Sequence, residues 1–278
     1  MSKHIVIVGA TGSIGKAAAF ELAKRNCNLV LLGKNENKVN QLKVEISQLY
    51  PLVKIDTALV DLAEPESVQD CCRELKNRYT QLNGLINAAA TYETTRKVNS
   101  LGIELMFATN HLGPYQLIVG VLDLLKAAPS ARIMNISAPS STKLNFDDLF
   151  FEKKFSAIRA YEATKTANLL FTFKLAQLVS WTYVSAFAFH PGVVKSNLLN
   201  NMPTFLKILL KNVAREPDKV SKVIAYFMLN NFEDTLNAHL VKIDGSIHEP
   251  SPYFKSVENL NQLWDISHEL TLDRHSIH

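Results

Sequence analysis

The first half of the chain alternates short apolar runs with longer stretches of helical pattern. The apolar runs are nearly continuous in Val, Ile, Leu or Ala, which is typical of strands buried on both faces. The predicted strands are His4–Gly9, Cys27–Leu32, Val53–Val60, Gly84–Asn87, Arg132–Ser137 and Thr182–Phe189. The predicted helices begin near Gly12, Asn35, Glu64, Ser100 and Ala157. This alternation predicts βαβ units, and therefore an α/β fold in which helices cover both faces of a parallel sheet.

The pattern changes after the sixth predicted strand. Residues 197–213 form an amphipathic stretch in which apolar residues surround Lys207 and Lys211. Because small-molecule sites are apolar and are often closed by a separate segment, we expect a substrate lid over residues 197–215. The alternative is a membrane-surface helix over Pro203–Val213, since its lysines accompany an apolar face. No repeat or linker divides the sequence, so we expect one domain over residues 1–278.

Composition narrows the classes of partner. The 278 residues include 30 Lys and Arg against 26 Asp and Glu, a net charge of +4 with no long block of one sign. We therefore expect no nucleic-acid partner. The apolar runs are shorter than the roughly 18 residues of a spanning helix, so no transmembrane segment is expected. Cys27 stands alone and Cys71 and Cys72 are adjacent, a spacing that suggests neither disulfides nor a metal site and favours a reduced, cytoplasmic setting.

Three glycines follow the first predicted strand at three-residue spacing. Gly9, Gly12 and Gly15 lie between this strand and a helix-forming run. Glycines let the backbone turn tightly and approach a pyrophosphate, while the helix N-terminus presents free N–H groups to the anion. The order of strand, glycine turn and helix predicts a dinucleotide-binding loop. Its predicted cofactor-binding residues are Gly9, Thr11, Gly12, Ser13, Ile14 and Gly15.

The end of the second predicted strand bears on the choice of cofactor. An acidic residue there would hydrogen-bond a ribose 2′-hydroxyl and repel a 2′-phosphate. The sequence instead has Gly33, Lys34 and Asn35. We therefore expect Lys34 and Asn35 to contact the cofactor and NADP(H) to be favoured over NAD(H). The alternative is that Lys34 is a solvated residue in a charged turn.

Tyr161 and Lys165 provide candidate acid–base chemistry. They lie four residues apart within a predicted helix, so both side chains are on one face. A free phenol has a pKa near ~10, and a neighbouring ammonium favours its ionised form. Such a tyrosine can exchange a proton with a carbonyl or alcohol oxygen while a nicotinamide carries the hydride.

These motifs occur in one order along nearly the whole chain, and the set resembles the short-chain dehydrogenase/reductase family, with most likeness to its retinol-dehydrogenase-like branch. The resemblance rests on the glycine loop and on NHLGPYQL (110–117), NFDDL (145–149), AYEATKTANLLFTFKLA (160–176), HPGVVKSNL (190–198) and LWDISHELT (263–271). It implies a Rossmann-type doubly wound sheet of about seven strands in the order 3-2-1-4-5-6-7. It also implies a small-molecule carbonyl or alcohol substrate, and a homodimer formed through the helices that carry Asn110 and Tyr161.

The resemblance implies further site residues. Asn110 would hold a water for proton relay toward Lys165, and Tyr161 and Lys165 would also contact the cofactor. The remaining implied cofactor-binding residues are Asp61, Leu62, Asn87, Ala88, Ala89, Pro191, Gly192, Val193 and Ser196. We interpret His111 and His190 as structural histidines.

One departure from the family pattern affects catalysis. Ala138 occupies the position of the serine that hydrogen-bonds the substrate oxygen, and loss of one such donor costs on the order of 10² to 10³ in rate. Ser137 or Ser140 could take this role, or the enzyme works without it. The sequence thus predicts an NADP(H)-dependent oxidoreductase that interconverts a carbonyl and an alcohol on a lipophilic substrate. The alternative is an NADP(H)-binding sensor or scaffold protein with weak or no turnover.

Overall fold

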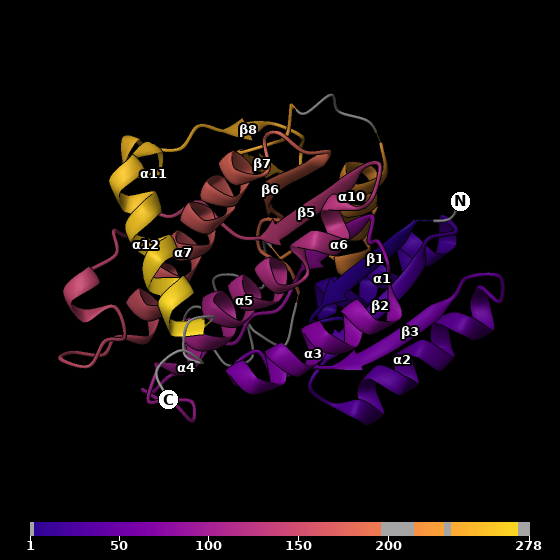
Figure 1. Ribbon diagram of the computed structural model, residues 1–278, viewed down its shortest axis with the longest axis horizontal. Coiled ribbons are helices and arrows are strands. Elements are labelled where there is room, and N and C mark those ends of the chain that lie inside the picture. Colours follow the sequence, from indigo (N-terminus) through magenta and orange to yellow (C-terminus); the bar gives the residue numbers. More distant parts are fainter. Residues whose placement is uncertain (1–2, 196–213, 231–234, 272–278) are drawn as a thin grey trace.

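Eight strands form one sheet in the order β3-β2-β1-β4-β5-β6-β7-β8 in the computed structural model, which describes residues 3–195, 214–230 and 235–271 (Figure 1). The strands are β1 (His4–Val8), β2 (Asn28–Gly33), β3 (Ile55–Leu59), β4 (Gly84–Asn87), β5 (Ala131–Ile136), β6 (Val184–His190), β7 (Leu240–Lys242) and β8 (Ile247–His248). All neighbouring pairs are parallel except β7 and β8. The predicted α/β fold and the order of its first seven strands are confirmed, and β8 adds a short antiparallel edge.

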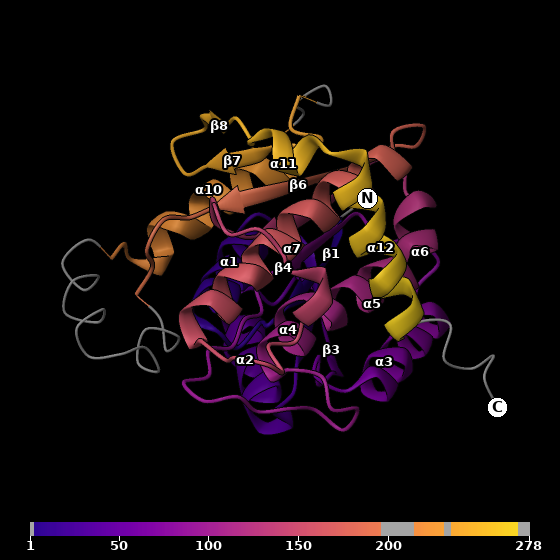
Figure 2. The same ribbon diagram turned by 90° about the vertical axis from the view of Figure 1, so that its left-hand side faces the viewer.

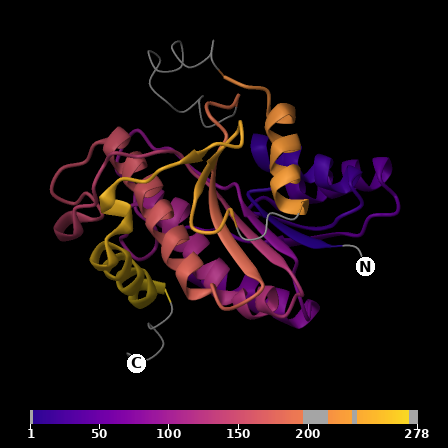
Figure 3. The ribbon, with the colours of Figure 1, turned by 90° about the horizontal axis from the view of Figure 1, so that it is seen from above.

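Helices cover both faces of the sheet. They are α1 (Ser13–Lys24), α2 (Glu36–Leu49), α3 (Pro65–Arg78), α4 (Leu105–Phe107), the π-helix η1 (Ala108–Leu112), α5 (Gly113–Gly120), α6 (Leu122–Lys126), the 3₁₀ helix η2 (Phe146–Asp148), α7 (Ala157–Leu178), α10 (Pro217–Leu229), α11 (Pro252–Lys255) and α12 (Val257–Thr271). Figure 3 shows the sheet between two layers of helices. None of these described helices is both long and apolar enough to span a bilayer.

The alternation of side chains along β1 explains the two layers. Val6 and Val8 point into a core with α3, α5 and α7, whereas Ile5 and Ile7 point into a core with α1, α2 and α10. Successive side chains of a strand lie on opposite faces, so a run of apolar residues buries both. Each fully buried Val or Ile contributes roughly 1.5–3 kcal/mol to folding. The six predicted strands agree with β1–β6 to within two residues at each end.

One predicted helix start is wrong. A helix was expected near Ser100, but α4 begins at Leu105. The Asn99 side chain accepts hydrogen bonds from the N–H groups of Leu101 and Ile103, at 3.0 Å each, and Gly102 has a φ of +77°. A side chain that bonds its own backbone holds a turn in place of a helix.

The C-terminal helix α12 packs against α7 and α5 (Figure 2). The Trp264 ring lies 5.0 Å from the ring of Tyr115 on α5 and 6.0 Å from the ring of Phe171 on α7. Nε2 of His111 lies 2.9 Å from the Ser267 hydroxyl, which joins α12 to η1. These are the helices through which the resemblance implies a homodimer. In such a homodimer, the second copy would contact only the surfaces of α5 and α7 that α12 does not cover.

His111 is fully buried, and its ring is neutral. Burial lowers its pKa to about 3. The Ser267 hydroxyl donates its hydrogen to the Leu263 carbonyl at 2.7 Å, so His111 Nε2–H donates to Ser267. The geometry is that of a structural histidine.

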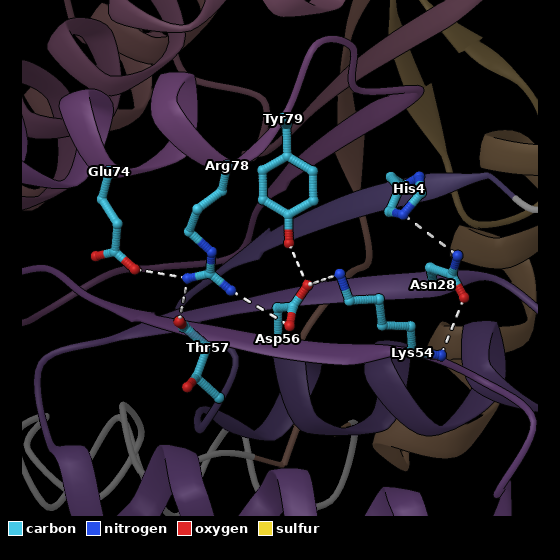
Figure 4. A network of polar contacts seen from close by, with 8 residues as sticks. All are labelled: His4, Asn28, Lys54, Asp56, Thr57, Glu74, Arg78 and Tyr79. Atoms are coloured by element: carbon cyan, nitrogen blue, oxygen red, sulfur yellow. Dashed lines mark hydrogen bonds and ion pairs between the residues drawn. The ribbon is translucent and has the colours of Figure 1, made fainter.

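A polar network ties the amino ends of the first three strands together (Figure 4). The Asp56 carboxylate on β3 accepts a hydrogen bond from the Tyr79 hydroxyl at 2.5 Å and pairs with Lys54 at 3.2 Å and Arg78 at 3.3 Å. Burial alone would raise the pKa of Asp56, but the Tyr79 hydroxyl, Lys54 and Arg78 outweigh it and lower the pKa. The ionised carboxylate therefore stabilises the fold.

We predict that Tyr79→Phe lowers the free energy of unfolding by about 1 kcal/mol at pH 7 and by less at about pH 3. The folded pKa of Asp56 is depressed, so its contribution is present above the unfolded value and is lost as the pH falls through the folded value. Urea denaturation at both pH values measures this. Tyr183→Phe is the matched control, because the Tyr183 side chain is 78% exposed. An equal loss at both pH values would contradict the assignment.

Candidate cofactor and catalytic site

A cavity of about 400 Å³ opens at the carboxyl ends of β1, β2, β3 and β4. The strand order reverses between β1 and β4, and ligands of doubly wound sheets bind at such a switch point. Many of the predicted cofactor residues line this cavity together. They are Gly9, Thr11, Gly12, Lys34, Asp61, Leu62, Ala88 and Ala89.

The glycine loop brings the end of β1 against the end of β4. Gly9 has a φ of +73°, and a Cβ on it would lie 2.8 Å from the Ala89 Cα. The Gly12 N–H donates to the Gly9 carbonyl at 3.0 Å and closes the turn, and a Cβ on Gly15 would overlap that carbonyl. Helix α1 then begins with Ser13, Ile14 and Gly15, and no side chain caps its N-terminus. Its free N–H groups can bind an anion.

Of the two predicted cofactor contacts after β2, one lines the cavity and the other caps a helix. Lys34 is exposed and lies on the cavity wall. The Asn35 side chain instead accepts a hydrogen bond from the Lys38 N–H at 2.9 Å and caps α2. Asp61, after β3, accepts from the Ala63 N–H at 3.0 Å. Among the described residues that line the cavity, Lys34 is the cation.

Tyr161 and Lys165 lie on one face of α7, as the spacing predicts. The Lys165 Nζ is 5.1 Å from the centre of the Tyr161 ring. Lys165 is 8% exposed and Tyr161 is half-buried. The ammonium is thus placed beside the phenol and is largely removed from water, where its electric field is stronger than at the surface.

Asn110 connects this turn of α7 to the cavity. Its Oδ1 accepts from the Thr91 N–H at 2.7 Å, and its Nδ2 donates to the Thr91 carbonyl at 3.0 Å and to the Thr164 hydroxyl at 3.3 Å. Thr91 lines the cavity, and Thr164 precedes Lys165. The side chain comes from the π-helix η1, and such turns occur often at functional sites. Both ends of the Asn110 amide are engaged, so the side chain acts here as a clamp.

Asn87 ends β4 with one unpartnered polar atom. Its Nδ2 donates to Asn135 Oδ1 on β5 at 3.1 Å, and Asn135 Nδ2 donates to the Thr172 hydroxyl on α7 at 2.9 Å. Asn87 Oδ1 is buried without a hydrogen-bond partner among the described residues. Asn87 itself does not line the cavity but directly precedes Ala88, which does, so this buried unpaired acceptor lies beside the cavity wall.

Comparison with known proteins agrees with this geometry. Residues 3–206 match the family model for short chain dehydrogenases. This chain belongs to the short-chain dehydrogenase family. Human retinol dehydrogenase 12 is 33% identical over 205 residues, which cover 72% of this chain and 64% of its own length. Mouse retinol dehydrogenase 13 is 32% identical over 201 residues, which cover 70% of this chain and 60% of its own.

The chain therefore spans less than two thirds of the length of the retinol dehydrogenases that it matches. Two solved structures share the fold. A protein from Mycobacterium paratuberculosis has a TM-score of 0.76 at 23% identity and covers 97% of this chain and 93% of its own. A Shigella flexneri short chain dehydrogenase complexed with NADP has a TM-score of 0.70 at 18% identity and covers 87% and 97%.

Ser137 and Ser140 were the candidates to replace the serine that the family resemblance expects where this chain has Ala138. Ser137 is 3% exposed, and its hydroxyl donates to the Lys165 carbonyl at 3.4 Å. Ser140 Oγ lies 2.8 Å from the Thr166 hydroxyl. Thr166 donates its one hydrogen to the Thr142 carbonyl at 2.7 Å, so Ser140 must donate to Thr166. Both serine hydrogens are thus used within the protein.

The segment after β6 carries the last predicted contacts. Pro191 is buried, and Gly192 has a φ of +73° with the guanidinium of Arg215 where its Cβ would be. Val193 accepts a hydrogen bond from the Arg215 N–H at 2.8 Å, so the two ends of the predicted lid are joined. Ser196 and residues 197–213 of the predicted lid lie outside the described residues.

Sequence reasoning missed Arg215 and Tyr92. Arg215 follows a long amphipathic stretch and carries no local motif. Tyr92 packs its ring against Tyr161, with ring centres 5.5 Å apart. Its only sequence signal is an aromatic residue directly after the small residues that line the cavity.

These residues fit a dinucleotide. The glycine cradle leaves room for a pyrophosphate, the uncapped N-terminus of α1 offers free N–H groups to it, and Lys34 supplies a positive charge on the cavity wall. Gly9, Gly12 and the first residues of α1 would hold the pyrophosphate.

We predict that Gly12→Asp weakens NADPH binding at least tenfold while the unfolding free energy changes by less than about 1 kcal/mol. The aspartate would cap α1 and place a negative charge where the phosphates bind. Gly12 has a φ of −76°, which any residue adopts, and a Cβ there would lie 3.3 Å from the Gly9 carbonyl oxygen, so only a small shift of that oxygen is needed. Fluorescence titration with NADPH measures the affinity, and Gly12→Ala separates bulk from charge. Unchanged affinity in Gly12→Asp would rule out this loop as the phosphate site.

Proposed function

We propose that the protein is an NADP(H)-dependent oxidoreductase that interconverts a carbonyl and an alcohol on a lipophilic small molecule. One observation carries the proposal: the Tyr161 ring lies beside the buried Lys165 ammonium on the turn of α7 that Asn110 joins, through Thr164, to Thr91 of the cavity wall. A phenol and an ammonium held together near a ligand cavity are suited to proton exchange with an oxygen atom.

The chain's own residues divide the chemical work. The Tyr161 hydroxyl gives a proton to a carbonyl oxygen, or takes one from an alcohol in the reverse direction. The Lys165 charge stabilises the negative charge that develops on oxygen during this transfer. A bound nicotinamide supplies or accepts the hydride. Asn110 keeps Thr91 and α7 in fixed positions, so the cavity wall and the acid–base pair stay aligned.

NADP(H) is proposed over NAD(H) because Lys34 is the cation at the end of β2 and no carboxylate occupies positions 33–35. A 2′-phosphate there would be attracted by the lysine. Short chain dehydrogenases solved in complex with NADP or NADPH share the fold, which supports the proposal. The relatives named retinol dehydrogenases support a lipophilic substrate. We propose the cytoplasm as the location, from the reduced setting that the cysteines suggest.

A second function is favoured by the hydroxyls around Ala138. Because Ser137 and Ser140 use their hydrogens within the protein, a protein that binds NADP(H) with weak or no turnover is the competing proposal. Ala138→Ser discriminates between the two. A large gain in turnover supports a weakened site, and no gain supports another donor.

We predict that Tyr161→Phe lowers the rate of NADPH oxidation on a panel of lipophilic aldehydes and ketones by about 10²-fold or more. The ring remains and only the proton donor is lost, so NADPH affinity should stay within about twofold. Absorbance of the reduced cofactor measures the rate. Tyr183→Phe, an exposed tyrosine, is the matched control. Turnover that survives Tyr161→Phe would refute the proposed acid–base role.

We predict that Lys34→Glu weakens NADPH binding at least tenfold relative to NADH, because the new carboxylate repels a 2′-phosphate. The ratio of the two dissociation constants is the measurement, and it cancels changes in stability. Lys24→Glu makes the same change of charge at the C-terminal end of α1, away from the cavity, and should leave the ratio unchanged. An unchanged ratio in Lys34→Glu would show that Lys34 is only a solvated residue.

A further inference from the structure

The hydroxyl of Tyr92 is buried and forms no hydrogen bond with another described residue. Its side chain is 3% exposed and packs with Met106 and Ala160. The Tyr92 oxygen has no hydrogen-bond partner among the described residues. A buried hydroxyl in that condition costs the fold stability relative to a phenylalanine of the same shape. Such a group calls for an explanation beyond packing.

The position of Tyr92 beside the cavity and Tyr161 offers an explanation for this buried hydroxyl. It follows directly on Ala88, Ala89, Ala90 and Thr91, which all line the cavity. Its ring meets the Tyr161 ring edge-on, with centres 5.5 Å apart and planes inclined by 65°. The pKa of Tyr92 is raised, first by burial and then by the neighbouring Tyr161 hydroxyl. The two phenols therefore lie within electrostatic reach of each other.

Three other hydroxyls of described residues near Tyr161 and Lys165 already have acceptors. Ser137 donates to the Lys165 carbonyl, Ser140 donates to Thr166, and Thr164 donates to the Tyr161 carbonyl at 2.7 Å. Among these side chains, Tyr92 is the one whose hydrogen has no acceptor. A tyrosine phenol is protonated at neutral pH, so Tyr92 is a donor.

We propose that the Tyr92 hydroxyl is a second hydrogen-bond donor to the substrate oxygen, beside Tyr161. This inference rests on the proposed oxidoreductase function. Tyr161 transfers its proton, whereas Tyr92 only donates a hydrogen bond, so no covalent bond of Tyr92 forms or breaks. Donors aimed at an oxygen that gains negative charge lower the barrier more than they strengthen substrate binding. Tyr92 thereby does the work of a hydroxyl that Ala138 cannot supply.

The test is Tyr92→Phe, which keeps the ring contacts and removes only the oxygen. We expect kcat to fall by about 10²-fold, with NADPH affinity unchanged and the midpoint of urea unfolding unchanged or higher. Tyr79→Phe is the matched control, and we expect it to change stability but not kcat. Its hydroxyl has a partner in Asp56 at the far edge of the sheet, so stability should fall and kcat should not.

A kcat within twofold of the wild type would overturn the inference, as would a loss of kcat accompanied by a lower unfolding midpoint. Tyr161→Phe, measured in parallel, separates this failure from that of the proposed function. If Tyr161→Phe is inactive and Tyr92→Phe is fully active, only the inference fails. If wild-type protein has no turnover, or Tyr161→Phe keeps it, the proposed function fails and the inference with it. Recovery of kcat when Ala138→Ser is added to Tyr92→Phe supports the inference, because a new hydroxyl then replaces the lost donor.

Discussion

The whole site depends on one backbone contact, in which the turn after β1 lies directly on the turn after β4. Gly9 makes this contact with Ala89, and any side chain at Gly9 would overlap the Ala89 backbone. The Ala88 N–H also donates to the Val8 carbonyl at 3.0 Å, which extends the pairing of β1 and β4 beyond their ends. These contacts set the width of the crevice at the switch point, where the cavity lies.

Asn110 connects the turn after β4 to the turn of α7 that carries Tyr161 and Lys165. The β4 turn continues to Thr91, whose N–H and carbonyl are both held by the Asn110 amide. The same amide reaches Thr164, one residue before Lys165. The cavity wall and the turn of α7 that carries Tyr161 and Lys165 are therefore fixed to one side chain. Helix α12 also holds η1 in place, because Ser267 is hydrogen-bonded to His111, the residue next to Asn110.

Much of the sheet could be predicted because its strands are long apolar runs. β7 and β8 could not be located, because three and two residues leave no periodicity. The helix expected near Ser100 failed because Asn99 and Gly102 form a turn, an effect of single residues that the apolar pattern does not reveal. Tyr161, Lys165 and the glycine loop carry local spacing and were found. Arg215 and Tyr92 depend on tertiary contacts and were missed, and the commitment of the Ser140 hydrogen follows only from its partners in space.

The proposed acid–base role of Tyr161 and Lys165 requires a hydride transfer at the carboxyl edge of the sheet. The most direct measurement follows deuterium from NADPH labelled at the transferable position of the nicotinamide into the product of a lipophilic aldehyde or ketone. We expect one deuterium on the carbinol carbon and a single-turnover rate slower than with unlabelled NADPH. Tight NADPH binding with no deuterium in any product of the panel would contradict this role.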